Sequence, residues 1–195
     1  MTDPAELAGV RAAQTALDEW LAGLEPVDPG RPSELPGWTV GHVLTHLARN
    51  ADSHVRMLAG QVQYPGGAEQ REGDIAAGAG RPWAEQVADL AAAHARLAAA
   101  WDAVADGSAL ADLPLRRWRE VELHRIDLGL GYTFADLPAE YVRRELAALT
   151  MRYRASRPIG LTELPTQVAR AAPAVRLAWL TGRAEVDGLP PAAVL

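Results

Sequence analysis

Apolar residues recur at the spacing of an α-helix along most of this chain, and no convincing run of alternating β-branched residues interrupts them. This pattern argues against a sheet-based fold and predicts a mainly α protein. The expected helices lie at about residues 4–24, 39–58, 82–105, 114–130 and 138–154. Four long helices with a fifth attached predict an antiparallel helical bundle as the core.

We expect the bundle to occupy residues 1–155, because the character of the sequence changes after Ser156. Prolines break the segment "RPIGLTELPTQVARAAP", and "AVRLAWLTGR" is typical of a short helix closed by Gly182. The final segment, 156–195, is too short for an independent core of ordinary size. It is therefore expected to form a short C-terminal extension that packs on the bundle.

A glycine-rich stretch, "GQVQYPGGAEQREGDIAAGAGRP", separates the second and third expected helices and covers residues 60–82. Its composition predicts an irregular loop rather than regular structure. A loop of this length inside a compact domain is usually functional or disordered. We expect it to lie beside a functional site of the bundle, which it could cover.

Cysteine and lysine are both absent, so all 19 basic side chains are arginines. Without cysteine, the chain has no disulfide, no thiolate metal ligand and no sulfur nucleophile of its own. Without lysine, it cannot form a Schiff base with a substrate. Any thiol chemistry would therefore need a thiol supplied from outside.

The formal net charge of −6 and the lack of a basic cluster argue against a nucleic-acid partner. No apolar run approaches the roughly 20 residues needed to cross a bilayer. The N-terminal stretch "MTDPAELAGVRAAQ" has no apolar signal-peptide region. The sequence therefore predicts a cytoplasmic protein that works on small molecules, with neither nucleic acid nor membrane as a partner.

A carboxylate and an imidazole lie one helical turn apart in "RRWREVELHRIDLG", where Glu120 and His124 share a helix face. Arg117 and Asp127 lie near the same stripe. Such a pair could hold a metal together with ligands from a facing helix, as in metalloprotein bundles. It could equally be an exposed acid–base pair that stabilises a solvated helix face.

Three of the five histidines lie in the second expected helix, and any of them could complete a metal site. On a helical wheel His54 falls inside the apolar stripe, His46 on its border and His42 on the polar side. A satisfied core histidine is an alternative reading of His54. His94, in the third expected helix, has no acidic or histidine partner at helical spacing and is interpreted as structural. Spacing alone leaves the choice open.

Four segments of the chain resemble the mycothiol-dependent maleylpyruvate isomerase family, which belongs to the DinB-like metal-binding bundles. They are "SELPGWTVGHVLTHLARNADSH", "YPGGAEQREGDIAAGAGRPWAEQVADL", "REVELHRIDLGLGY" and "AWLTGR". The first three follow one another in the family's order over roughly residues 30–135. The resemblance implies a DinB-like four-helix bundle. The short C-terminal extension departs from the family pattern, because the family isomerases carry a larger α/β domain after the bundle and only about 40 residues remain here.

The resemblance also implies a metal site and a cofactor. In the family, zinc is held by a histidine and by a Glu and His four residues apart, which correspond here to His46, Glu120 and His124. His42 and His54 would then be structural. Three ligands leave one position open for water or for the thiol of mycothiol. The implied reaction is thiolate addition to the cis double bond of maleylpyruvate, rotation, and expulsion of the thiol to give fumarylpyruvate.

Charged residues are expected around such a site, because the substrate carries carboxylates and the reaction develops enolate charge. Arg183 resembles a catalytic arginine in the C-terminal part of the family, while Arg71 and Arg117 are further candidates. Asp127 could hold an arginine or orient a ligand. Each of the arginines could instead be a surface residue, and Asp127 an exposed acid on the helix.

Three other functions fit the same features. A mycothiol S-transferase would keep the metal and the thiol but use a different electrophile. A metal-dependent hydrolase would activate water in place of the thiol. A non-catalytic metal-binding or ligand-sensing bundle would share the ligands without the chemistry. The open three-ligand site and the long glycine-rich segment favour an enzyme over a binding protein. The ligands alone do not identify the metal as zinc, because a His/Glu/His set also accepts nickel, cobalt or iron.

Overall fold

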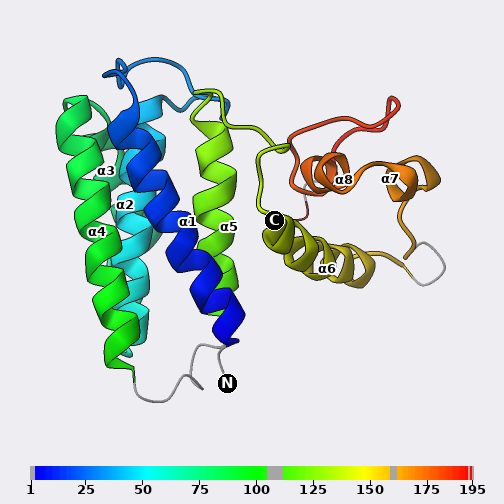
Figure 1. Cartoon of the computed structure of the whole chain (residues 1–195), viewed down its shortest axis with the longest axis horizontal. Coiled ribbons are helices and arrows are strands. Elements are labelled where there is room, and N and C mark those ends of the chain that lie inside the picture. The colour runs from blue at the N-terminus through cyan, green and yellow to red at the C-terminus, as the bar shows by residue number, and fades with distance from the viewer. Residues whose placement is uncertain (1–2, 105–111, 159–161, 193, 195) are drawn as a thin grey trace. The chain divides into compact units, whose positions relative to one another are not determined.

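The chain folds into two compact units, Met1–Gly131 and Tyr132–Leu195, each of which is described here by itself. The computed structural model describes residues 3–104, 112–158, 162–192 and 194 (Figure 1). Helices dominate both units, which confirms the mainly α prediction. In the described part of the chain, β pairing is limited to two isolated bridges, Pro32 with Thr39 and Val186 with Leu189.

Four long helices make up most of the first unit. They are α1 (Pro4–Gly23), α2 (Val40–Leu58), α4 (Trp83–Ala103) and α5 (Leu113–Asp127). They lie side by side in Figure 1, and their facing sides bury leucines and valines such as Leu17, Leu44 and Leu90. None of the described helices is both long and apolar enough to span a membrane.

The direction of the helices differs from the expected antiparallel bundle. Arg49 pairs with Asp89 and Asp52 pairs with Arg96, so α2 and α4 run in the same direction. The expectation of a fully antiparallel arrangement is wrong for this pair. The reason is an additional helix, α3 (Gly67–Ala79), which carries the chain back along α2 before α4 begins.

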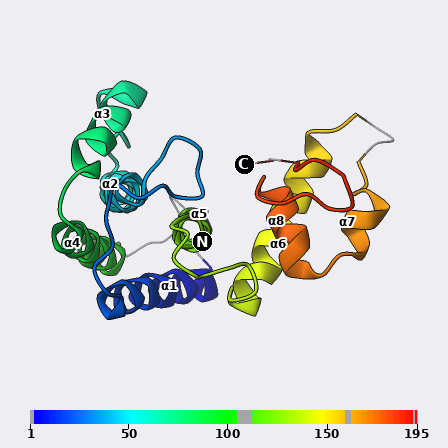
Figure 2. The same cartoon turned by 90° about the horizontal axis from the view of Figure 1, so that it is seen from above.

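The helix α3 occupies most of the segment that the glycine content predicted to be an irregular loop. That prediction is wrong, because tertiary packing holds the segment in helical form against α2, on the side away from α1 (Figure 2). Two glycines allow the close approach: Gly41 of α2 faces the Ala79 carbonyl, and Gly78 of α3 faces Thr45. The Gln86 amide donates to the carbonyls of Gly78 and Ala79 and satisfies the end of α3.

Gly41→Ala is expected to lower the free energy of unfolding by about 1–3 kcal/mol, as overpacking a close contact does. A Cβ at this position would overlap the Ala79 carbonyl oxygen, which is backbone and cannot turn aside. Gly80→Ala is the matched control, since a Cβ there meets no atom within 4 Å and its φ is −88°. Urea denaturation of both variants measures the effect. Equal stability of the two would show that α3 does not depend on this contact.

The helix α2 begins and ends with local signals that the sequence carries. Thr39 caps its N-terminus, and the imidazole of His42 interacts in return with the Thr39 backbone N–H, which forms a capping box. Gly60, with φ of 71°, follows the C-terminal end. The apolar stripe predicted from the sequence is buried, including Val43, Leu44 and Leu47.

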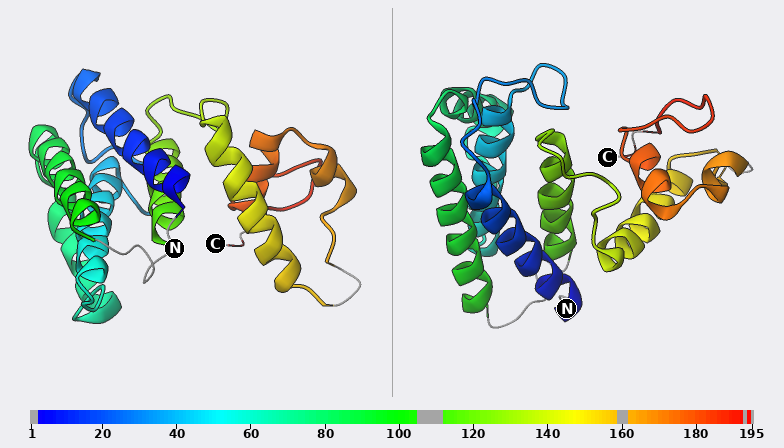
Figure 3. Two further views of the ribbon diagram at one scale, coloured as in Figure 1. Left: turned by 60° about the horizontal axis from the view of Figure 1, so that its bottom comes forward. Right: turned by 45° about the horizontal axis from the view of Figure 1, so that its top comes forward.

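The second unit contains α6 (Ala139–Ala155), α7 (Thr166–Arg170) and α8 (Pro173–Leu180). The helix α6 lies alongside α8 (Figure 3), and the rings of Tyr153 and Trp179 are 5.7 Å apart in their shared core. The structure therefore divides after Gly131, which differs from the expected bundle over residues 1–155 and C-terminal segment over 156–195. Helical periodicity shows that α6 is amphipathic but not which neighbour covers its apolar face.

Candidate metal centre

Three side chains from α2 and α5 converge in the first unit. His46 of α2 is almost fully buried, and Glu120 and His124 lie one turn apart on α5. One donor atom from each lies within 4.8 Å of the other two, an arrangement that could hold a metal ion. The structure thus brings together the three residues that the family resemblance suggested as ligands.

The carboxylate of Glu120 joins the two imidazoles. Its Oε2 lies 2.9 Å from His46 Nε2 and 3.4 Å from His124 Nε2. The two rings are nearly perpendicular, with centroids 4.7 Å apart. All three side chains therefore direct a potential ligand atom toward one point.

The pKa values of these groups reflect their burial and mutual contacts. Burial lowers the pKa of His46, although the hydrogen bond with Glu120 opposes this. Burial alone would raise the pKa of Glu120, but hydrogen bonding to His124 and His46 holds it well below its usual range. Burial also acts to lower the pKa of His124, yet hydrogen bonds to Asp127 and Glu120 raise it. At neutral pH Glu120 is a carboxylate and His46 an uncharged imidazole, so neither group carries a positive charge that would repel a metal ion.

Asp127 fixes the orientation of His124. Its Oδ2 lies 2.8 Å from His124 Nδ1, and the residue is 1% exposed. An ionised carboxylate only accepts hydrogen bonds, so Nδ1 carries a proton and Nε2 is left to face Glu120. This contact fits the orienting role suggested for Asp127 by the sequence.

Arg71 of α3 lies beside the cluster. Its Nη2 is 3.2 Å from His46 Nδ1, and its Nη1 pairs with Glu72. Because a guanidinium only donates hydrogen bonds, His46 Nδ1 accepts and the Nε2–H donates to Glu120. Arg71 belongs to the segment 60–82, so this part of the segment lies beside the three converging side chains.

The other two predicted arginines have partners of their own. Arg183 is in the second unit, after α8, where its Nη1 donates to the Thr181 carbonyl at 2.9 Å. Arg117 is fully buried in the bundle and bonds to Asn50 and His94 rather than to the cluster. Arg71 thus lies in hydrogen-bond contact with a candidate ligand.

The remaining histidines have structural roles. His42 completes the cap of α2. His54 donates from Nδ1 to the Asn50 carbonyl, and burial, reinforced by the charge of Arg117, lowers its pKa to about 4, so it stays neutral. His94 pairs with Asp18 through Nδ1 at 2.8 Å. The structure thus agrees with the interpretation of these three as parts of the framework.

Trp38 is a site residue that the sequence analysis did not single out. Its ring lies edge-on to His46, with centroids 5.5 Å apart, and also packs 6.1 Å from the ring of His42. It covers one side of the cluster and limits the positions that the His46 ring can take. An aromatic residue directly before the cap at Thr39 is the sequence signal that could have indicated it.

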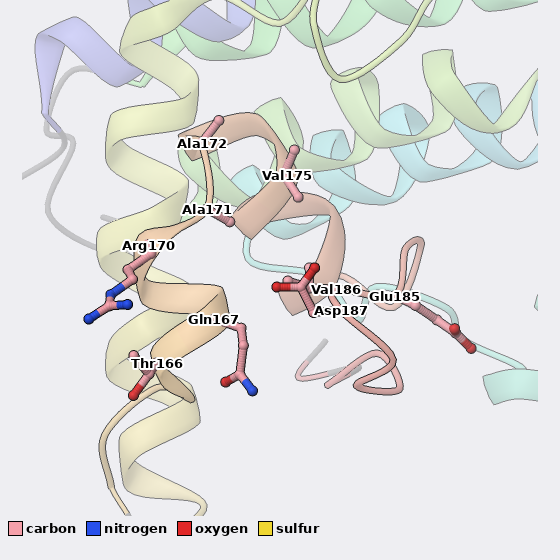
Figure 4. A pocket seen from close by; sticks show the side chains of 9 residues that line it. All are labelled: Thr166, Gln167, Arg170, Ala171, Ala172, Val175, Glu185, Val186 and Asp187. Carbon is pink, nitrogen blue, oxygen red and sulfur yellow. The ribbon is translucent and has the colours of Figure 1, made fainter.

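A pocket of about 500 Å³ lies in the second unit, between α7, α8 and residues 185–187 (Figure 4). Arg170 and Asp187 are among the side chains around it. None of the predicted site residues lines this pocket. It shares no lining residue with the cluster of His46, Glu120 and His124.

Two solved structures resemble this chain over most of its length. One is the crystal structure of the mycothiol-dependent maleylpyruvate isomerase, with a TM-score of 0.79, 22% identity, and coverage of 92% of this chain and 89% of that chain. The other is a variant of that enzyme with a histidine replaced by alanine, with a TM-score of 0.78, 21% identity and the same coverage. At these identities the likeness establishes the fold alone.

Sequence comparison gives the relationship directly. No curated protein matches the chain significantly. The family model for the mycothiol maleylpyruvate isomerase N-terminal domain matches residues 10–129, which include His46, Glu120 and His124. Since this match spans more than half of the chain, the protein belongs to the mycothiol maleylpyruvate isomerase N-terminal domain family.

Proposed function

We propose that this protein is a mycothiol-dependent enzyme that converts maleylpyruvate from the cis to the trans isomer and that it uses a divalent metal, preferentially zinc. The observation that carries the proposal is the convergence of His46, Glu120 and His124 within 4.8 Å of one another. Membership of the family and the fold shared with a solved isomerase support the choice of reaction. We include in this proposal a cytoplasmic location and small molecules, the substrate and the thiol, as the partners.

The donor set suits zinc. Two imidazole nitrogens and one carboxylate oxygen are borderline ligands that zinc accepts in catalytic sites, and three protein ligands leave a position for a further group. A bound zinc ion would lower the pKa of a coordinated thiol and so provide a thiolate at neutral pH. The absence of cysteine from the chain fits a reaction in which the thiol comes from the cofactor.

The residues around the cluster would orient the metal ligands and bind the substrate. Asp127 holds the Nδ1 proton of His124 and keeps the Nε2 directed inward. Arg71 is about one-third exposed, so its guanidinium can pair with a substrate carboxylate near the metal. Trp38 packs against His46 and keeps water from that side. Arg183, which resembles a catalytic arginine of the family, is the second residue that we propose to bind a substrate carboxylate.

The test combines metal analysis with a mycothiol titration. We expect the purified protein to hold about one zinc ion per chain, and calorimetry to detect mycothiol binding to the zinc-loaded form but not to the metal-free form. Equal binding to both forms, or a protein that retains no divalent metal, would contradict the proposal. Mycothiol binding without isomerisation of maleylpyruvate would identify a mycothiol S-transferase with the same site.

A further inference from the structure

A chain of polar side chains, buried except for the partly exposed Asp18, joins the four long helices of the first unit. Arg117 of α5 donates from Nη1 to Asn50 Oδ1 of α2 at 2.6 Å and from Nη2 to His94 Nε2 of α4 at 2.8 Å. His94 Nδ1 then lies 2.8 Å from Asp18 Oδ1 of α1. We call these four residues, one from each helix, the Arg117 network.

The hydrogen-bond directions in the network are fully determined. Arginine only donates, so His94 Nε2 accepts and the Nδ1 proton is donated to Asp18. Burial lowers the pKa of Arg117 to about 10, which leaves it charged at neutral pH. Burial also lowers the pKa of His94, so its imidazole is neutral, as this arrangement requires. The network therefore has one stable protonation state.

The network lies directly next to the metal cluster. Arg117 precedes Glu120 by three residues on α5, and Asn50 follows His46 by four residues on α2. Each is one helical turn away from a candidate ligand. The bond between Arg117 and Asn50 therefore ties α2 to α5 one turn from the point where His46 meets Glu120.

Stability alone does not explain the network. Arg117 is fully buried, and among the described residues its guanidinium bonds directly to no carboxylate. Burying a charge carries a large desolvation penalty, and apolar side chains of similar volume usually stabilise a core as well or better. The bonds do, however, fix the distance and rotation between two helices, which apolar packing specifies less sharply.

We propose that Arg117 and Asn50, braced by His94 and Asp18, are positioning residues that set the spacing of α2 and α5 and so preorganise His46, Glu120 and His124 for metal. This inference rests on the proposed metal site. It assigns a role to residues that touch neither metal nor substrate. Supporting groups of this kind typically change metal affinity by about 10–100-fold.

The decisive variant is the double substitution N50L/R117M, which replaces the bond by apolar side chains. We expect its metal-free form to melt at or above the wild-type Tm, because the buried charge is gone. Its dissociation constant for zinc, measured by competition with a chromogenic chelator, should rise by about 10-fold or more. The single substitution Asn50→Asp keeps an acceptor for Arg117, so its zinc affinity should stay within about threefold of wild type.

Two further variants separate positioning from general stability. Arg117→Lys keeps the charge, but a single ammonium group cannot bond to Asn50 and His94 as the forked guanidinium does. This variant should fold, and it should bind zinc more weakly than wild type. Leu21→Ala opens a cavity in the same bundle and should lower the Tm without changing zinc affinity. Two results would overturn the inference and leave the proposed function intact. One is wild-type zinc affinity in both N50L/R117M and Arg117→Lys, and the other is a loss of zinc affinity in Leu21→Ala equal to theirs. Failure of the wild-type protein to bind zinc would overturn it together with the proposed function.

Discussion

His124→Ala is expected to yield a protein that retains almost no zinc after purification. His124 supplies one of only three converging donor atoms, and a site with two protein ligands cannot compete with buffer and water for the ion. The substitution also leaves Asp127 buried without the imidazole that it contacts at 2.8 Å. His46→Ala should have the same effect on metal content, which mass spectrometry of metal-loaded, desalted protein measures directly.

His42→Ala is the matched control. His42 lies on the same helix as His46, one turn earlier, but its ring completes the cap of α2. Its loss should cost about 0.5–2 kcal/mol of stability, as the loss of a helix cap does, with zinc retained. Zinc at 100 times its dissociation constant should stabilise the wild type by about 2.7 kcal/mol and His124→Ala hardly at all. If His42→Ala loses zinc and His46→Ala keeps it, the ligand assignment is wrong.

The second large effect concerns the thiol. The zinc-loaded protein should convert maleylpyruvate to fumarylpyruvate only when mycothiol is present. The chain offers neither a cysteine nor a lysine that could form a covalent adduct with the double bond. Conversion can be followed by the change in absorbance of the substrate with and without the thiol. Turnover at the same rate in its absence would exclude the thiol mechanism and favour a water-based one.

Two arginine variants refine this experiment. Arg71→Ala should lower kcat/KM by about 10-fold or more while leaving zinc in place, because it removes a charged partner for the substrate rather than a ligand. Arg183→Ala should act in the same way if the C-terminal unit contributes to binding. Full activity of Arg183→Ala would leave that residue with a structural role just after α8, through its bond to Thr181.

Much of this architecture could be predicted from local sequence. The cap at Thr39 and the apolar stripe of α2 depend on residues within a few turns, so they can be seen without a structure. The pairing of Glu120 with His124 is likewise a property of one helix. Helical spacing alone left three histidines of α2 open as their partner. The family resemblance pointed to His46, and the position of α2 relative to α5 brings that residue to the pair.

The errors share a physical cause. The helix α3 has a composition unfavourable to helices and is stabilised by contacts with α2, which no local pattern reveals. The assignment of α6 to the bundle followed from its amphipathic face, although that face is covered by α8. The position of Arg71 beside His46 depends on both the fold of α3 and its packing, so it needed the structure.

The shallow burial of α3 affects how the first unit can open by local unfolding. The helix buries few side chains, chiefly Ile75 and Ala79, whereas α2 is buried along most of its length. Local unfolding requires the least free energy where little apolar surface is covered. Detachment of α3 is thus expected at a fraction of the cost of global unfolding. Arg71 would leave His46 in that event, and the metal cluster would gain a transient opening to solvent while the four long helices stay folded.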